Sequence, residues 1–444
     1  MPKKKTALTI EERLQQALVP AEEQPYEVPE NWVWVYGKNI LMPMESKKPD
    51  GEDFYYIDID AIDNKNQVVT EAKKIKTAQA PSRASRKLHT GDTVFSLVRP
   101  YLKNIAYIDE QLSECIASTG FFVCTPNAAL NDKYLYNLMV SSYVVDGLNK
   151  YMKGDNSPSI RKDDIENYPF PLPPLSEQQR IVERIEELFA KLDEANERLQ
   201  EVAESFAVRK AAILHKAFTG ELTKQWRLEN GVSDESWEEK KFSEVAVIKS
   251  NLVSPFDYLD YPHIAPDSIE KFTGRLLSYR TIREDNVKSP KHLFYKGQIL
   301  YSKIRPYLSK AIIADVDGLC SADMYPIEAL CNTKYLLKYM LSTEFLEQST
   351  TAGSRSLLPK INQKELSSIS VPLPSLPEQH EIVRLIDDLL ARERAAQQAA
   401  EQALASIDLM KKSILARAFR GELGTNKASE ASALELLKQV LAEN

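Results

Sequence analysis

The chain has 444 residues, of which 43% are hydrophobic and 27% are charged, and its formal net charge is −7. This composition is that of a soluble globular protein that is too long for a single core, and no apolar run approaches the ~20 residues that span a bilayer. The N-terminus lacks the apolar segment and the cleavage site of a secretory signal, so we expect a cytoplasmic protein.

The chain begins with an extension that carries a short helix, over residues 1–24, and a globular domain follows over residues 25–170. Strand-like runs in this domain include residues 55–62 and 93–98, and one amphipathic helix is predicted over residues 133–152. We predict an α/β (α+β) fold with a mixed, mostly antiparallel sheet.

A long helix is predicted next, in a region over residues 171–225. It follows the octet PLPPLSEQ at 171–178, in which Ser176 is a suitable N-cap with Gln179 at the capping-box position. No proline or glycine occurs between Leu175 and Thr219, which predicts one uninterrupted helix. Apolar residues recur along it at alternating steps of four and three, which is a heptad seam. The seam residues are Ile181, Ile185, Leu188, Leu192, Ala195, Leu199, Val202 and Phe206.

The second half of the chain repeats the first. The octet PLPSLPEQ occurs 201 positions after its counterpart, and the match continues without a gap to AFTGEL (217–222) and AFRGEL (418–423). Upstream, GDTVFSLVRPYLKN matches GQILYSKIRPYLSK, and ENW matches ESW. A gapless match of this length is an internal repeat. It predicts a second globular domain over 226–371, a second helical region over 372–425 and an amphipathic tail over 426–444.

The second long helix begins near Ser375, where Glu378 completes another capping box. Its seam keeps Ile382, Ile386, Leu389 and Ile407 in equivalent places, with Glu393 as a defect. Each helix must bury its apolar stripe, and the other helix is covalently available, so we predict one intramolecular antiparallel coiled coil. Pairing between two copies of the chain is the alternative.

Charge is distributed unevenly along the chain. Residues 73–103 contain eight lysines and arginines against the single acid Asp92, and residues 271–310 are similarly basic. Residues 177–204 carry nine acids and four bases. Two basic regions separated by an acidic helix indicate local binding of a polyanion despite the negative net charge.

Catalytic motifs are absent from the sequence. It contains neither a phosphate-binding glycine loop nor an aromatic tetrad for methyl transfer to an amine, and nuclease-like spacing of Asp234, Glu238 and Lys240 falls in a charged linker. The four cysteines are scattered, and their spacing predicts buried free thiols and no metal site.

Most candidate DNA-binding residues fall in two kinds of segment that each half contains, and Arg83, Arg86 and Lys87 lie in a further segment, APSRASRKL (80–88). The RPYL turns place arginines and lysines that suit guanine edges or phosphates, although a structural salt bridge in the turn is an equal alternative. A polar segment after each amphipathic helix could bind phosphate or form an ordinary capped turn. The candidates are Arg83, Arg86, Lys87, Arg99, Lys103, Ser157, Arg161, Lys162, Arg280, Lys303, Arg305, Lys310, Ser354, Arg355 and Lys360.

These motifs resemble those of the specificity subunits of type I restriction–modification enzymes, over essentially the whole chain. The two octets, the AFTGEL and AFRGEL helix ends, and PSRASR and RPYLKN carry the resemblance. It implies two target-recognition domains that each read half of a split DNA site, with helices that space them and dock methyltransferase subunits.

The resemblance also implies that catalysis, with S-adenosylmethionine, ATP and Mg²⁺, belongs to separate methyltransferase and endonuclease subunits. Two alternatives are a fused methyltransferase–nuclease specificity protein and a coiled-coil scaffold without a nucleic-acid role. A helical spacer predicts that four residues inserted into the helix over 181–206 change the spacing between the half-sites but not their sequences.

Overall fold

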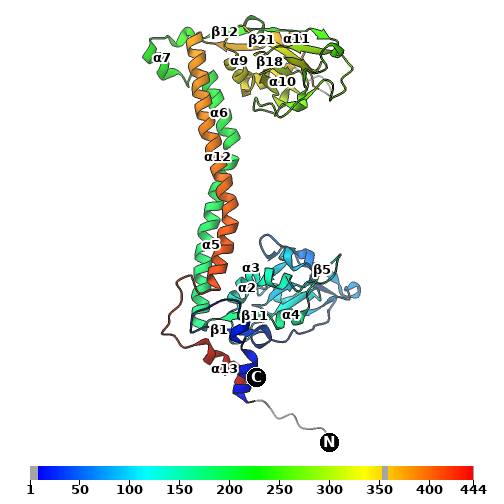
Figure 1. Cartoon of the computed structure of the whole chain (residues 1–444), viewed down its shortest axis with the longest axis vertical. Coiled ribbons are helices and arrows are strands. Elements are labelled where there is room, and N and C mark those ends of the chain that lie inside the picture. Colours follow the sequence, from blue (N-terminus) through cyan, green and yellow to red (C-terminus); the bar gives the residue numbers. More distant parts are fainter. Residues whose placement is uncertain (1–8, 353–358, 444) are drawn as a thin grey trace. The chain divides into compact units, whose positions relative to one another are not determined.

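The computed structural model describes residues 9–352 and 359–443. The chain forms two compact units, Met1–Arg198 with Ala403–Asn444 (unit 1) and Leu199–Gln402 (unit 2). Each unit contains one globular domain and parts of the long helices (Figure 1). In the described ranges, no helix is both long and apolar enough to cross a membrane.

The globular domain of unit 1 holds two sheets of three and four strands and two strand pairs. The four-stranded sheet has the order β5-β2-β9-β6, in which only β2 and β9 run parallel. The three-stranded sheet, β10-β7-β8, is antiparallel. The strands are β1 (Val33–Tyr36), β2 (Asp53–Ile57), β3 (Ile62–Asp63), β4 (Val68–Val69), β5 (Lys73–Lys76), β6 (Ala84–Lys87), β7 (Thr93–Ser96), β8 (Ile105–Tyr107), β9 (Ile116–Ser118), β10 (Phe121–Cys124) and β11 (Pro169–Leu172).

Unit 2 repeats this topology. Its larger sheet, β16-β15-β20-β17-β14, again has one parallel pair, β15 with β20, and a second sheet has the order β13-β21-β18-β19. The predicted mixed, mostly antiparallel fold is therefore confirmed in both halves. The strands are β12 (Glu238–Lys241), β13 (Ala246–Ile248), β14 (Leu252–Val253), β15 (Pro262–Ile264), β16 (Arg280–Thr281), β17 (Lys291–Phe294), β18 (Ile299–Ser302), β19 (Ala311–Ile313), β20 (Gly318–Cys320), β21 (Met324–Ala329) and β22 (Ser370–Leu373).

The amphipathic helix predicted in each domain is divided in two. In unit 1, α2 (Asp132–Val140) ends at Ser141, which is extended and whose hydroxyl accepts from the N–H of Val144 to start α3 (Ser142–Asn149). In unit 2, Ser342 accepts in the same way from Phe345, between α9 (Thr333–Met340) and α10 (Thr343–Ala352). Serine offers the backbone an alternative to continued helix, which the apolar periodicity conceals. The other short helices are α1 (Ile10–Ala17), α4 (Lys162–Glu166), α7 (Lys224–Asn230), α8 (Phe242–Val245) and α11 (Gln363–Ser367).

The first long helix is also interrupted, at Ser205, where one continuous helix was predicted. It consists of α5 (Leu175–Glu204) and α6 (Phe206–Phe218). The hydroxyl of Ser205 donates to the carbonyl of Val202, and the guanidinium of Arg209 donates to both. These side chains compete for helix carbonyls and locally disturb the helix. The second long helix, α12 (Leu376–Ala418), is continuous.

The two long helices pair within the chain, and segments of them pair inside each unit. In unit 1, Asp193 of α5 forms a 2.6 Å ion pair with Lys411 of α12, whose ammonium lies over the ring of Phe189. In unit 2, Arg209 of α6 forms a 2.5 Å ion pair with Glu393 of α12. Residue numbers rise along one helix as they fall along the other, so the pairing is antiparallel in cis.

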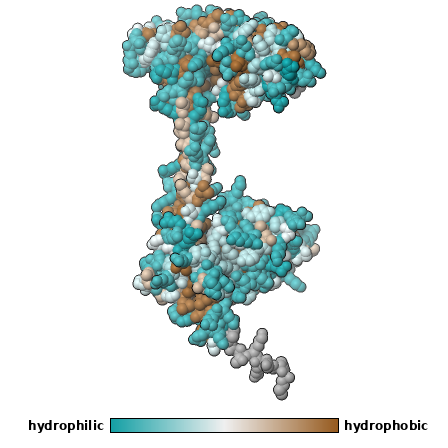
Figure 2. Space-filling model, in the orientation of Figure 1, coloured by the Kyte–Doolittle hydropathy of each residue, from teal (hydrophilic) through white to brown (hydrophobic). Residues whose placement is uncertain are grey.

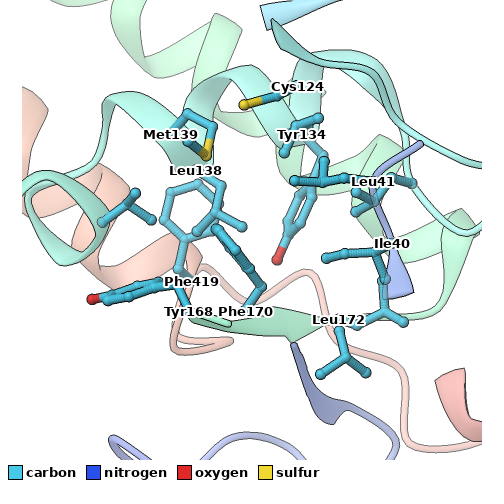
Figure 3. Packing of buried hydrophobic residues seen from close by; sticks show 14 of the residues in the cluster. Ile40, Leu41, Cys124, Tyr134, Leu138, Met139, Tyr168, Phe170, Leu172 and Phe419 are labelled. Atoms are coloured by element: carbon cyan, nitrogen blue, oxygen red, sulfur yellow. The ribbon is translucent and has the colours of Figure 1, made fainter. Parts of the chain in front are cut away.

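The ends of the helices complete the cores of the globular domains. Ile181 and Ile185 share the unit 1 core with Leu415 of the opposite helix and with Phe419, which follows that helix directly, and Figure 3 shows Phe419 among the aromatic and aliphatic side chains of the domain. In unit 2, Ile382 and Ile386 pack in the same way with Leu214 and Phe218. Between these ends the predicted seam is shallower. Leu188, Leu192, Leu199, Phe206 and Leu389 are half-buried, Ile407 is buried and Val202 is 39% exposed.

The ion pair with Arg209 accounts for the polar residue in the second seam. Replacing Glu393 alone with leucine is expected to destabilise unit 2 by about 1 kcal/mol, because the half-buried guanidinium loses its carboxylate. Replacing Glu393 and Arg209 together with leucine is expected to be neutral or stabilising. Thermal unfolding of the full chain measures both effects. A double variant less stable than Glu393→Leu would contradict the pairing role.

The C-terminal tail packs on unit 1. Helix α13 (Ala433–Glu443) buries Leu437 and Val440 in the core of that unit and contacts α1, and Arg13 of α1 donates a 3.1 Å hydrogen bond to the carbonyl of Leu441. Before α13, Glu430 forms a two-point ion pair with Arg180 of α5. The sequence did not indicate a role for this tail. In the structure it packs against α1, so that the two ends of the described chain lie together in unit 1.

Candidate nucleic-acid interface

Each domain is fixed to its helices by a buried glutamate of the octet. In unit 1 the carboxylate of Glu177 accepts a 2.8 Å hydrogen bond from the indole of Trp32 and a 2.7 Å bond from Asn426. In unit 2 the carboxylate of Glu378 accepts from the indole of Trp237 at 3.1 Å, and from Thr223 and Arg227 at 2.7 Å. Both glutamates are fully buried.

The glutamine that follows each glutamate completes the anchor. Gln178 accepts from the N–H of Asn131 at 2.7 Å, and its equivalent Gln379 accepts from the N–H of Asn332 at 2.9 Å. These side chains bind the domain, so the predicted capping by the octet is wrong for Glu378. Helix α5 begins at Leu175, before Ser176, so that serine is not the N-cap either. A capping pattern and a buried anchor look alike in sequence.

The RPYL turns have the same conformation in both units. Arg99 precedes the 3₁₀ turn η5 (Pro100–Leu102) and Arg305 precedes η10 (Pro306–Leu308), and both arginines have a φ of 49°. The residues that follow the turns, Lys103 and Ser309, also have positive φ, at 56° and 44°. These left-handed conformations are unfavourable for residues with a Cβ atom.

The polar segment after α3 lies directly against the first turn, and its counterpart lies against the second. The N–H of Arg99 donates a 2.8 Å hydrogen bond to the carbonyl of Pro158, and the N–H of Arg305 donates a bond of the same length to Pro359. The structure therefore brings together the two kinds of candidate segment in each domain, although about sixty residues of chain separate them in unit 1.

Neither turn arginine forms a described salt bridge, which was the structural alternative. The guanidinium of Arg99 donates to the carbonyl of Asn156 at 2.9 Å. Within residues 9–352 and 359–443, the side chains of Arg305, Arg83 and Arg280 have no hydrogen-bond or ion-pair partner, and all are exposed. Ser157 and Arg161 are also exposed, and Ser354 and Arg355 lie outside the described residues.

Several other candidates are partly occupied by the chain itself. Burial lowers the pKa of Lys103, which lies near Lys412 and donates to the carbonyl of Val140. Lys303 lies over the ring of Tyr325. The remaining lysines have acidic partners: Lys87 with Glu45, Lys162 with Glu166, Lys310 with Asp267 and Lys360 with Asp323.

The short helices beside the polar segments are capped by their own carboxylates. The N–H of Arg161 donates to Asp164 at 2.7 Å, and the N–H of Asn362 donates to Glu365 at 2.9 Å. This arrangement corresponds to the capped turn that the sequence left open as an alternative to phosphate binding.

Sheet register relates two more pairs of positions across the repeat. Lys73 lies opposite Tyr56 as Arg280 lies opposite His263, so Lys73 is the unit 1 counterpart of Arg280. In the same frame Arg86 is the counterpart of the buried His292. In the described structure, Nε of Arg86 and Nδ1 of His292 are buried and have no hydrogen-bond partner. Sequence reasoning missed Lys73 and His292 because the gapless match does not extend to these strands.

The described residues contain no cluster of three or more histidines, cysteines or acids that could hold a metal ion. The four cysteines are free, and Cys115, Cys124 and Cys320 are buried as predicted, whereas Cys331 is half-buried. Burial raises the pKa of the Cys331 thiol to about 11 and that of Cys320 to about 12. Thiols with such high pKa values are inert.

The family model described as the type I restriction modification DNA specificity domain matches this chain twice, at residues 38–204 and 234–403. The chain belongs to this family. Each match covers most of one globular domain and part of the helix that follows it, so the two matches coincide with the internal repeat.

Several similar proteins are specificity subunits of type I restriction enzymes. The type I restriction enzyme EcoDI specificity subunit of Escherichia coli is 42% identical over 66% of this chain and 72% of its own length. The StySPI specificity subunit of Salmonella potsdam is 25% identical over 74% of this chain and 75% of its own. The crystal structure of the HsdS subunit from Thermoanaerobacter tengcongensis covers 90% of this chain and 99% of its own, with a TM-score of 0.70 and 26% identity.

The chain is thus a specificity subunit, the DNA-recognition component of a type I restriction–modification complex and not its catalytic component. The resemblance noted from the octets and the helix ends is confirmed. The residues that would contact DNA remain a prediction.

Proposed function

We propose that the domains at residues 25–170 and 226–371 each read one half of a bipartite DNA site. The observation that supports this most strongly is the repeated fold, in which both units have one parallel strand pair in an otherwise antiparallel sheet, the same RPYL turn and the same glutamate–tryptophan anchor. One domain reads only a few base pairs, since each bidentate contact gives ~1–3 kcal/mol of discrimination, and two domains multiply their selectivities.

The candidate DNA-binding residues divide by availability. Arg83, Arg99, Arg280 and Arg305 are exposed and have no carboxylate partner in the described ranges, so they could bind phosphates or base edges without breaking an ion pair. The lysines paired with acids would first have to exchange partners. Hydrophilic residues cover most of the visible face of both units (Figure 2).

We further propose that the helices dock two methyltransferase subunits. Val208 is 71% exposed and its repeat equivalent Leu409 is 65% exposed, one on each of the two long helices. Leu175 and Leu376, also equivalent, are 44% and 54% exposed. Equivalent apolar residues in the two units suit two copies of one partner.

On this proposal, the methyltransferase subunits bind S-adenosylmethionine, and endonuclease–translocase subunits bind ATP and Mg²⁺. We expect the specificity chain itself to bind none of these cofactors. We place the assembled complex in the cytoplasm of a bacterial or archaeal cell, where the target DNA lies.

Methylation mapping tests this function. Cells that express the cognate methyltransferase subunit are expected to carry N6-methyladenine at a bipartite sequence only when this chain is also expressed. Exchanging residues 25–170 for the equivalent domain of another specificity subunit should change one half-sequence and leave the other unchanged. Unchanged methylation without the chain would favour a scaffold role, and methylation by the purified chain alone would favour the fused-enzyme alternative.

A further inference from the structure

Both RPYL turns expose the same two side chains. Tyr101 is 47% exposed and Tyr307 is 42% exposed. The arginine two residues earlier is exposed in each case. The proline between them, Pro100 or Pro306, is buried and fixes the turn to the domain.

The contacts that both turns share do not involve these exposed side chains, although the guanidinium of Arg99 also donates to the carbonyl of Asn156. The main-chain N–H of Arg99 or Arg305 joins the polar segment, and the hydroxyl of Ser96 or Ser302 donates to the carbonyl two residues later. The position after the turn differs, being Lys103 in one unit and Ser309 in the other. A turn with only a structural role would leave the exposed arginine and tyrosine positions equally free to differ.

The turns hold non-glycine residues in left-handed conformations at both ends, which is unfavourable. Ordinary glycines at these four positions would form the same turn with less strain. Retaining arginine at the strained first position in both units indicates that its side chain has a task there.

Other exposed or unsatisfied positions differ between the units. The position of Lys73 in unit 1 is occupied by Arg280 in unit 2, and the position of Arg86 is occupied by His292. The exposed Arg83 comes directly before β6, and the strand that corresponds to β6 in unit 2, β17, is preceded by Pro290. Two domains that read different half-sequences must differ where they touch bases. They can share side chains only where they touch what every half-site has, which is the sugar–phosphate backbone.

We infer that Arg99 with Tyr101, and Arg305 with Tyr307, make the same sequence-independent contact to the DNA backbone, once at each half-site. This inference rests on the proposed function and assigns a role within it. The guanidinium binds a phosphate, and the tyrosine hydroxyl donates to a neighbouring phosphate while its ring packs on the sugar. Base reading falls to the diverged positions, including those of Lys73, Arg86 and Arg280.

The experiment uses the complex of the full chain with its methyltransferase subunits. Equilibrium affinity is measured for a duplex with the intact site and for one with both half-sites scrambled, at several salt concentrations. For Arg99→Gln and for Arg305→Gln we expect both affinities to fall by the same factor. The slope of log affinity against log salt should become shallower by about 0.9 for each arginine. Tyr101→Phe and Tyr307→Phe should also weaken both duplexes equally, with methylated half-sequences unchanged.

Two controls separate this role from a structural one. Arg99→Lys keeps the charge and should restore the salt slope, which it could not do if the loss came from a damaged turn. Arg275→Gln removes an exposed arginine of the same domain as Arg305, but one already neutralised by a two-point pair with Glu270, so the slope should not change.

Three results would overturn the inference: unequal losses on the two duplexes, an unchanged slope in both arginine variants, or loss of methyltransferase subunits from the complex, which would assign the turns to protein docking. If the wild-type complex does not bind DNA, the proposed function is overturned as well. This outcome is seen with the wild-type complex alone, so it cannot be confused with the three results that concern the variants.

Discussion

Replacing Glu378 with alanine is expected to destabilise unit 2 by about 3–5 kcal/mol. The substitution leaves the guanidinium of Arg227, which is only 7% exposed, buried beside the space of its lost carboxylate. It also removes the acceptor of Trp237 and Thr223. Hydrogen exchange of the full chain in increasing urea measures this effect, because it reports the opening of each unit separately.

Two variants provide the controls for this prediction. Adding Arg227→Met to Glu378→Ala should recover part of the stability, because the double variant removes both members of the buried ion pair. Glu177→Ala should cost less, about 1–3 kcal/mol, because the donors to Glu177 are the neutral Trp32, Thr425 and Asn426. Equal costs for Glu177→Ala and Glu378→Ala would show that the buried ion pair does not set the difference.

The second large effect concerns the target. Inserting one heptad after Arg198 and one after Gln402 is expected to lengthen the spacer between the half-sequences by about three base pairs. Seven helical residues add about 10 Å, and each base pair occupies about 3.4 Å. The insertions preserve the heptad pattern, so the pairs Asp193–Lys411 and Arg209–Glu393 keep their register. Methylation mapping should recover the original half-sequences at the new spacing.

A heptad inserted after Arg198 alone is the matched control. It displaces Arg209 from Glu393 by two helical turns, and this variant is expected to lose methylation or stability without acquiring a defined new spacer. The four-residue insertion that the sequence suggested shares this weakness, because it changes only one of two paired helices. A changed half-sequence in the doubly extended chain would contradict the spacer role of the helices.

Much of the architecture was predictable because the sequence contains an internal repeat. The gapless repeat from the octets to the helix ends located both helices, and apolar residues at heptad spacing predicted their antiparallel pairing. The family assignment followed from the same stretches. Local patterns of this kind depend only on residues that are neighbours in sequence.

Features decided by distant residues were not predictable. The octet glutamates fit a capping box, but Trp32 and Trp237 lie more than a hundred positions away and turn them into buried anchors. Ser141 and Ser205 interrupt helices because of their own hydroxyl groups, which an apolar count ignores. The equivalence of Arg280 and Lys73 in the two halves could be recognised only from the register of the strands in each sheet.

The candidate DNA-binding set was predicted only as a list of basic residues and two serines. The structure separates those with carboxylate partners, such as Lys87 and Lys360, from those without, such as Arg83 and Arg305. Charge along a sequence does not reveal which cations are already neutralised. The exposure of Tyr101 and Tyr307 was likewise not predictable, because each tyrosine lies between a proline and a leucine in the sequence.

The composition of unit 1 has a consequence for synthesis on the ribosome. Unit 2 is one contiguous segment, whereas unit 1 needs the C-terminal residues Leu415, Phe419, Asn426 and Leu437 for its core and anchor. The domain translated first therefore cannot finish folding until the last residues have emerged. A nascent chain halted before residue 403 would carry a complete second unit and a first unit with an open core. We therefore expect a prematurely terminated chain to expose its N-terminal domain to proteolysis.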